Sequence, residues 1–245
     1  EYFLILSGDQ LYDIDFREMY RFAKLTDADA IIAALPVKAN EARRMGILKV
    51  DENNFIRAFY EKPQEDHLLE KLRSPSDVIE RVGISGGAQR DFLGSMGIYL
   101  FKRKALLDLL MNDDREDFGK HLIPSLVEKG QAAAYLYNGY WEDIGTVASF
   151  YHANMALTDP VPSLSLHNER RPIFSCRHDL PPAIFSTTQI KQTILCEGSI
   201  IDADEVSHCI LGPRTVIRQG SIIRDSYVMG SDYYDAPVRD HHRLP

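Results

Sequence analysis

Two acidic turns, far apart in the sequence, carry residues suited to chemistry on phosphates. Asp9 follows the apolar run Tyr2 to Leu6 in a Ser-Gly-Asp turn. Asp143 follows a predicted strand, Ala132 to Tyr137, within the segment Gly139 to Thr146. In an open α/β sheet, ligands bind at the carboxyl ends of the strands, so both carboxylates are expected at that edge. Because Mg²⁺ binds through one or two carboxylates plus substrate phosphates, the pair indicates phosphoryl or nucleotidyl transfer.

Two further residues lie where they could bind a sugar phosphate. Lys62 closes a β-rich run just before Pro63, and its compact cation suits a phosphate group. Ser95 opens another predicted strand, where its hydroxyl or the backbone near Gly97 could donate to a sugar hydroxyl. Each also has an ordinary interpretation: a solvated strand end for Lys62, a small packed residue for Ser95, and a packing role for Trp141.

The elements expected to hold these residues form an α/β domain. Tyr2 to Leu6 is a continuous apolar run, which is typical of a strand buried on both faces of a parallel sheet. A helix capped by Asp15 follows, and then a strand from Ala30 to Leu35 that Pro36 should end, which together predict a βαβ unit. Gly46 to Val50 and Phe55 to Tyr60 predict a hairpin, and residues 64–90 a long surface excursion. Further predicted elements are a strand at 94–101 and helices at 105–111, 118–128 (capped by Asp117) and 147–157 (capped by Thr146).

The last third of the chain has a different pattern. Five prolines between Thr158 and Ala183 predict a linker or a wrapped segment. An aliphatic residue then recurs every six positions, which favours a parallel β-helix over ordinary hairpins with chance spacing. These residues are Ile194, Ile200 and Val206 and, after a phase shift, Ile210, Val216, Ile222 and Val228. The predicted domains are therefore 1–157, a linker at 158–186, and a β-helix at 187–245.

Composition excludes several classes of protein. The chain has 245 residues and a formal net charge of −8, so it has no basic surface for nucleic acid. No apolar run is long enough to cross a bilayer. Its three cysteines lack the spacing of a zinc site or a disulfide framework. The cytoplasm is the default compartment, with a plastid as the alternative.

Five segments of the chain strongly resemble ADP-glucose pyrophosphorylase (glucose-1-phosphate adenylyltransferase), in that family's order. They are Ser7-Gly8-Asp9-Gln10-Leu11-Tyr12, Phe59-Tyr60-Glu61-Lys62-Pro63, Ser95-Met96-Gly97-Ile98-Tyr99, Asp117-Phe118-Gly119-Lys120 and Tyr140-Trp141-Glu142-Asp143-Ile144-Gly145-Thr146. The acidic turns alone would fit any sugar nucleotidyltransferase, whereas the full set is specific to this family.

The resemblance implies a nucleotide-diphospho-sugar transferase-like (Rossmann-like) mixed sheet followed by a left-handed parallel β-helix. It implies the reaction of ATP with α-D-glucose 1-phosphate to give ADP-glucose and pyrophosphate, the step that activates glucose for glycogen or starch. Asp9 and Asp143 would hold the catalytic Mg²⁺. Lys62 would bind the sugar phosphate, and Gly46, Glu61 and Ser95 would line the glucose 1-phosphate site. A homotetramer and an allosteric effector would also be expected.

The chain departs from the family pattern in two respects. Many relatives have His where this chain has Gln10, a change that keeps a hydrogen-bonding side chain but loses a titratable one. The Gly-rich loop that grips the ATP triphosphate in the family does not occur in this sequence, nor do the later coils of the β-helix, so we expect this polypeptide to be inactive alone. Three alternatives stay open: a nucleotidyltransferase for another sugar phosphate or base, a non-catalytic regulatory or assembly subunit, and, least supported, an acyltransferase built on the β-helix.

Overall fold

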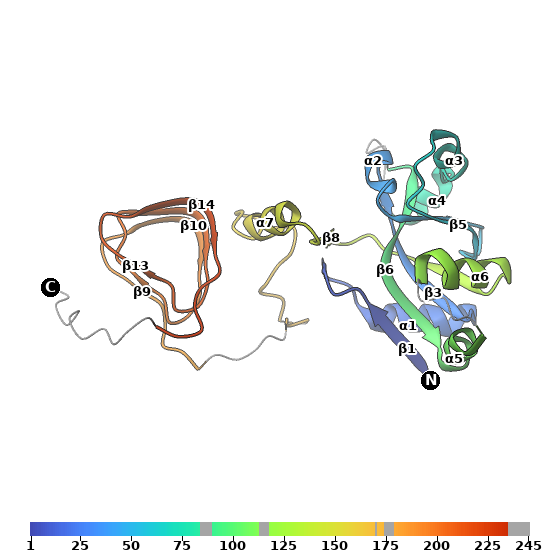
Figure 1. Cartoon of the computed structure of the whole chain (residues 1–245), viewed down its shortest axis with the longest axis horizontal. Helices are drawn as coiled ribbons and strands as arrows, with labels where there is room; N and C mark the ends of the chain where they lie inside the picture. Colours follow the sequence, from blue (N-terminus) through green and yellow to red (C-terminus); the bar gives the residue numbers. More distant parts are fainter. Residues whose placement is uncertain (84–89, 113–117, 170, 174–178, 235–245) are drawn as a thin grey trace. The chain divides into compact units, whose positions relative to one another are not determined.

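The computed structural model describes residues 1–83, 90–112, 118–169, 171–173 and 179–234. The chain divides into two compact units, Glu1–Trp141 and Glu142–Pro245 (Figure 1). This division places the helix after Thr146 with the β-helix, whereas the sequence suggests a boundary at residue 157. The limits of the predicted domains and linker stay a prediction, and each unit is described by itself below.

The first unit is built on a six-stranded mixed sheet. Its spatial order is β5 (Ile56–Glu61), β4 (Gly46–Val50), β6 (Phe92–Lys102), β3 (Ala30–Val37) and β7 (Ala132–Leu136), with β1 (Tyr2–Leu6) also paired to β6. β3 and β7 are parallel, and the other pairs are antiparallel. The predicted α/β class is confirmed, as are the hairpin and the positions of the main strands.

The long strand β6 changes the topology expected for the first two predicted strands. β1 and β3 are not neighbours, because β6 lies between them and pairs antiparallel with both. β1 is also not buried on both faces: Phe3 and Leu4 are 42% and 40% exposed, since β6 is its only strand partner among the described residues. Pro36 does not end β3, because β7 pairs with β3 only as far as Ala34 and needs no N–H from residue 36.

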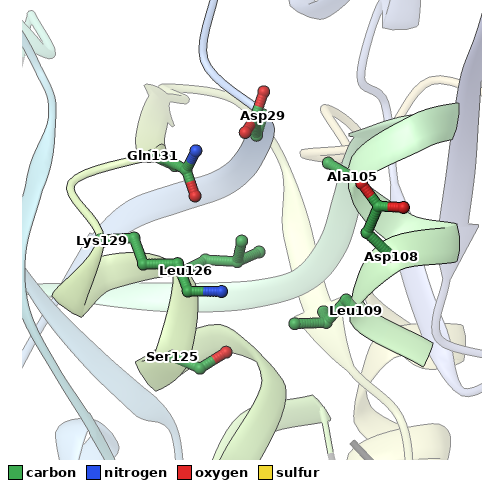
Figure 2. Close-up of a pocket in the computed structure, with 8 residues that line it drawn as sticks. All are labelled: Asp29, Ala105, Asp108, Leu109, Ser125, Leu126, Lys129 and Gln131. Atoms are coloured by element: carbon green, nitrogen blue, oxygen red, sulfur yellow. The ribbon is translucent and has the colours of Figure 1, made fainter. Parts of the chain in front are cut away.

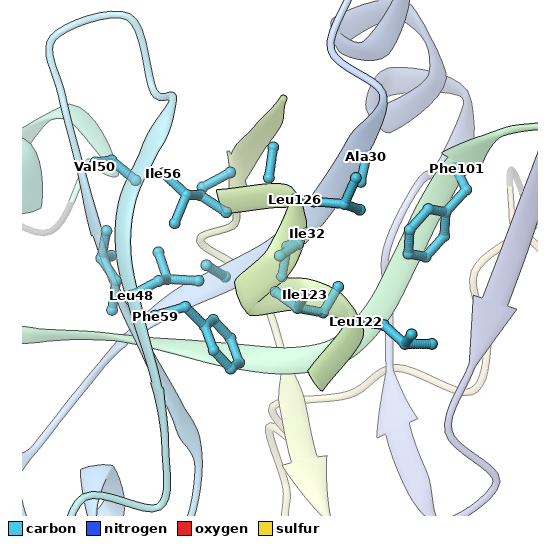
Figure 3. Packing of buried hydrophobic residues seen from close by; sticks show 14 of the residues in the cluster. Ala30, Ile32, Leu48, Val50, Ile56, Phe59, Phe101, Leu122, Ile123 and Leu126 are labelled. Atoms are coloured by element: carbon cyan, nitrogen blue, oxygen red, sulfur yellow. The ribbon is translucent and has the colours of Figure 1, made fainter. Parts of the chain in front are cut away.

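Two helical layers cover the sheet. The helix α1 (Phe16–Thr26) begins at Asp15, whose side chain accepts from Arg17 N as predicted, and it buries Met19 and Ala23 completely. On the other face, α5 (Arg103–Asn112), the π-helical turn η1 (Phe118–Leu122) and α6 (Ile123–Glu128) close the largest core cluster (Figure 3). The predicted cap Asp117 lies outside the described residues.

Three short helices occur where no helix was predicted. α2 (Ala39–Ala42) follows β3, and α3 (Asp66–Lys71) and α4 (Ser76–Arg81) lie within the predicted surface excursion. Their apolar residues are too few for a visible helical period, yet Leu69, Leu72 and Val78 are each no more than 5% exposed. Tertiary packing rather than local pattern therefore stabilises these turns.

The second unit begins within β8 (Trp141–Asp143) and continues into α7 (Val147–Ala156). Thr146 caps α7 as predicted: its hydroxyl accepts from Ser149 N at 3.1 Å, and Ser149 Oγ accepts from Thr146 N at 3.1 Å. No helix or strand lies between Ala156 and Ile184 among the residues described there, in agreement with the proline-rich composition.

The six remaining strands form two parallel sheets, one on each of two faces of a β-helix. One sheet contains β10 (Gln189–Leu195), β12 (Glu205–Leu211) and β14 (Ile222–Val228), and the other contains β9 (Ile184–Phe185), β11 (Ile200–Ile201) and β13 (Val216–Ile217). The predicted parallel β-helix is confirmed, but the aliphatic residues spaced six apart do not share one buried face. Ile200, Val216 and Ile222 are 38%, 47% and 58% exposed, whereas their neighbours Ile201 and Ile217 are buried.

The length of each coil explains this difference. Residues 190 and 206 pair, 16 apart, whereas residues 206 and 223 pair, 17 apart. Three strict hexads would need 18 residues per coil. Because the coils are shorter, a six-residue spacing does not keep its phase, and the aliphatic residues alternate between core and surface.

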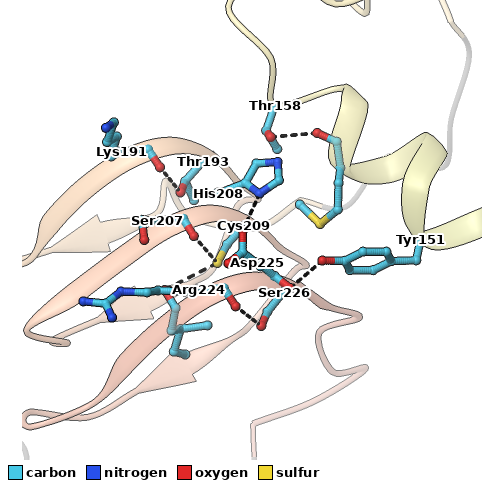
Figure 4. A network of polar contacts seen from close by, with 12 residues as sticks. Tyr151, Thr158, Lys191, Thr193, Ser207, His208, Cys209, Arg224, Asp225 and Ser226 are labelled. Carbon is cyan, nitrogen blue, oxygen red and sulfur yellow. Dashed lines mark hydrogen bonds and ion pairs between the residues drawn. The ribbon is translucent and has the colours of Figure 1, made fainter. Parts of the chain in front are cut away.

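One corner of the β-helix repeats from coil to coil. Gln192, His208 and Asp225 each have a positive φ, between 45° and 51°. In each case the next residue donates its hydroxyl or thiol to the carbonyl two positions earlier, from Thr193, Cys209 and Ser226. His208 Nδ1 lies 2.6 Å from Asp225 Oδ1, and Tyr151 of α7 donates to the carbonyl of Asp225 at 2.7 Å (Figure 4). The corner therefore both links successive coils and holds α7.

Candidate active site

The first predicted carboxylate lies in a turn between two strands of the first unit. β1 ends at Leu6, and β2 (Gln10–Tyr12) begins directly after Asp9. Ser7 donates to Asp9 Oδ1 at 2.7 Å, which fixes the carboxylate, and the Asp9 side chain is exposed. The turn therefore presents an oriented, solvent-exposed oxygen donor at the end of a strand.

The end of the β4–β5 hairpin brings three predicted site residues together. Gly46 pairs directly with Glu61, and Lys62 N donates to the carbonyl of Met45 at 3.0 Å. Lys62 has a φ of +49°, an unusual conformation for a residue with a side chain. Its ammonium is 3.7 Å from Glu61 Oε1, and the Lys62 side chain is 62% exposed.

Ser95 lies next to this hairpin end. The register pairs Ile47 with Gly94, so Ser95 is the β6 residue beside Gly46 in an antiparallel pair. Ser95 is only 8% exposed, and its Oγ accepts from Gly97 N at 3.3 Å. That N–H is therefore engaged inside the protein and is not available to a sugar hydroxyl as the sequence suggested.

A contact between three segments joins this corner to the Asp9 turn. Gly97 has a φ of +67°, and a Cβ added there would lie 2.9 Å from Gln10 Nε2. On the other side of Gln10, Trp141 Nε1 donates to Gln10 Oε1 at 3.3 Å. The sequence placed all three residues in family-like motifs but assigned no function to Gln10 or Trp141, since only the folded chain brings them together.

Asp143 belongs to the second unit. Its Oδ1 accepts from Gly145 N at 2.9 Å, and its carboxylate is exposed. The helix cap at Thr146 follows three residues later, so the Asp143 turn is built by local hydrogen bonds. Like Asp9, it is a hard oxygen donor with one oxygen oriented, which fits the ligand preference of Mg²⁺. Among the described residues, no group of three or more His, Cys, Asp or Glu side chains is placed to hold a metal.

A separate cavity of about 390 Å³ lies at the other end of the strands from the Asp9 turn (Figure 2). It opens between α5 and α6, next to the residues that precede β3 and β7. Asp29, Asp108, Lys129 and Gln131 line it above the apolar side chains of Leu109 and Leu126. None of the residues predicted for the sugar-phosphate site borders this cavity.

Comparison with protein-family models assigns the chain. The model described as Nucleotidyl transferase matches residues 1–160, which is more than half of the sequence. The chain therefore belongs to the nucleotidyl transferase family. A second model, described as GLGC left-handed parallel beta-helix domain, matches residues 178–243. The predicted left-handed β-helix is thereby confirmed, and the pair of domains is consistent with ADP-glucose pyrophosphorylase.

In the parts of the chain that the structure describes, no helix is long and apolar enough to cross a membrane.

Proposed function

We propose that this chain carries the sugar-phosphate site of a glucose-1-phosphate adenylyltransferase, the enzyme that converts ATP and α-D-glucose 1-phosphate into ADP-glucose and pyrophosphate. The observation that carries the proposal is the convergence of Gly46, Glu61, Lys62 and Ser95 at one corner of the sheet. Both family matches support it, because a nucleotidyl transferase domain and a GLGC-type β-helix occur in one chain.

In this proposal, the hairpin end binds the sugar phosphate. Lys62 places its ammonium against the phosphate of glucose 1-phosphate, and this contact orients a phosphate oxygen for in-line attack on the α-phosphorus of ATP. Pyrophosphate leaves as the new P–O bond forms. The ion pair with Glu61 at 3.7 Å keeps the Lys62 side chain at the hairpin end before substrate binds.

The remaining groups recognise the sugar. Glu61, whose side chain is 23% exposed, accepts a hydrogen bond from a glucose hydroxyl, and the Ser95 hydroxyl lies close by on the adjacent strand. Gly46 has no side chain, and this leaves room for the Phe59 ring and the Glu61 carboxylate beside it. Asp9 and Asp143 would hold Mg²⁺, which supplies charge neutralisation on the phosphate oxygens when bound.

Calorimetric titration tests this proposal directly. ADP-glucose is titrated into the chain with and without Mg²⁺, and UDP-glucose and GDP-glucose are titrated for comparison. We expect saturable, Mg²⁺-dependent binding that favours the adenine nucleotide. Equal affinity for all three would contradict the assignment to ADP-glucose.

Variants identify the residues responsible. Lys62→Ala and Asp143→Asn should each weaken binding by at least ten-fold, since each removes one charge-assisted contact to phosphate or metal. Lys71→Ala, an exposed lysine on α3, is the matched control and should bind like the wild type. Unchanged binding by both site variants would remove the hairpin end and the Asp143 turn from the proposed mechanism.

A further inference from the structure

We propose that Gln10 is a positioning residue, whose carboxamide helps to hold the turn that carries Asp9 against Trp141 through a neutral hydrogen bond between two side chains. Gln10 follows Asp9 directly, and Trp141 precedes Asp143 by two residues. The two carboxylates proposed to bind Mg²⁺ are therefore each within two residues of one partner of this bond. The inference rests on the proposed function only for the choice of Asp9 and Asp143 as metal ligands. The hydrogen bond between Gln10 and Trp141 is observed independently of that choice.

The chemistry of the two side chains fixes the orientation of the Gln10 carboxamide. The indole of Trp141 has a donor and no acceptor, so the atom facing it at 3.3 Å must be the amide oxygen. The amide nitrogen then faces Gly97, whose missing Cβ leaves the space that this nitrogen occupies. Any side chain at position 97 would displace Gln10 from this place.

The surroundings of Trp141 explain why the bond should matter. The Trp141 ring is partly buried, and it packs against an apolar cluster that includes Ile14 and Met96. A hydrogen bond in such a place is only partly exposed to competition from water. Two nearby bonds hold the same segment: Tyr137 donates its hydroxyl to Asp13 O at 2.8 Å, and Asp13 N donates to Tyr140 O at 3.3 Å. The Gln10–Trp141 bond joins two side chains, so a substitution at Gln10 removes it and leaves these two other bonds in place.

An uncharged link suits this position. A charged residue next to Asp9 would compete with a metal ion or change its affinity, whereas a carboxamide does not titrate.

The experiment uses Trp141, which is the only Trp in the chain, as a built-in probe. Mn²⁺, as a spectroscopic substitute for Mg²⁺, is titrated into the full chain without nucleotide. Its binding is followed by electron paramagnetic resonance, and the Trp141 emission is recorded in parallel. Gln10→Met removes both the acceptor and the donor at nearly equal volume. We expect a shifted emission maximum and a Mn²⁺ midpoint raised by about three- to ten-fold, the range that corresponds to one net hydrogen bond.

Gln10→His supplies a rescue that a purely structural role would not reproduce. At pH 8 the neutral imidazole offers an acceptor nitrogen to the indole, so the emission and the Mn²⁺ midpoint should return toward the wild-type values. Each variant is compared with the wild type at the same pH. Gln131→Met, an exposed glutamine before β7, is the matched control and should change neither readout.

Two results would overturn the inference: a Mn²⁺ midpoint in Gln10→Met equal to that of the wild type, or no specific Mn²⁺ binding by the wild type. Failure of the proposed function looks different, because the chain would then bind Mn²⁺ with the expected dependence on Gln10 but would not bind ADP-glucose.

Discussion

Gly46 lies directly against the ring of Phe59: a Cβ built at position 46 would be 2.5 Å from Phe59 Cζ. The same Cβ would be 2.9 Å from Glu61 Oε2. Phe59 is 7% exposed and belongs to the main core cluster, so its ring cannot move away freely. The ring of a core residue thus leaves no room for a side chain at position 46. The proposed sugar-phosphate site depends on this glycine, because a larger residue would displace Phe59 or Glu61.

Gly46→Ala tests this relationship. The added methyl group should displace Phe59 or Glu61 and lower the free energy of unfolding by about 1–3 kcal/mol, as overpacking in a core does. The affinity for glucose 1-phosphate should fall as well, because Glu61 would move with the strand. Urea denaturation and calorimetry measure the two effects. Gly8→Ala is the control, since a Cβ at position 8 would meet no atom within 4 Å, and it should leave the stability nearly unchanged.

Lys62→Gly separates stability from binding. Glycine adopts the observed φ of +49° without steric cost, although it also makes the unfolded chain more flexible. We expect the free energy of unfolding to stay the same or to rise by up to about 1 kcal/mol. Binding of glucose 1-phosphate should be reduced at least ten-fold because the ammonium is lost. A variant that is clearly destabilised, or that binds normally, would contradict this view of Lys62.

Thr146→Ala removes the cap of α7. The Thr146 hydroxyl satisfies Ser149 N, which would otherwise have no helical partner, so the loss should destabilise the second unit by about 1 kcal/mol. Thermal unfolding followed by circular dichroism measures the change. Val147→Ala, at an 87% exposed side chain in the same turn, should shift the transition by less than half as much. Equal effects of the two substitutions would show that the capping bond is unimportant.

The pKa of Glu205 should report on the packing of two β-helix coils. Hydrogen bonds from Arg224, and next from Ser207, lower this pKa from its ordinary value of 4.5 to about 2. Because the pKa is lower in the folded state, the ionised carboxylate stabilises the fold above pH 4.5, and this contribution is lost as the pH falls toward 2. Arg224→Gln should move the pKa back toward 4.5 in a carbon-13 NMR titration. Arg218→Gln should leave the titration curve of Glu205 unchanged.

Local signals in the sequence predicted many of the elements correctly. Asp15 and Thr146 mark helix starts because a short polar side chain satisfies the first free N–H groups, a purely local interaction. The hairpin around Asp51 was equally clear: its carboxylate accepts from the backbone N–H of Asn53 and Phe55 at 2.9 Å. The motifs around Asp9, Lys62, Ser95 and Asp143 also predicted the family that the domain matches confirm. The roles of these four residues stay a proposal.

Long-range pairing decided what the sequence did not determine. No local pattern shows that β6 lies between β1 and β3, because strand order depends on contacts between residues far apart in the chain. Which residues of the β-helix are buried depends on the length of its coils, which is 16 or 17 residues. Neighbouring residues of a strand face opposite sides, so Ile201 is buried whereas Ile200 lies at the surface. The same holds for Gln10, whose partners Gly97 and Trp141 lie 87 and 131 positions away along the chain. Sequence by itself therefore determined most of the elements, the motifs and the class of protein, because these depend on neighbouring residues. Only the tertiary structure decided which side chains face each other, because distant segments must first pair before their residues can meet.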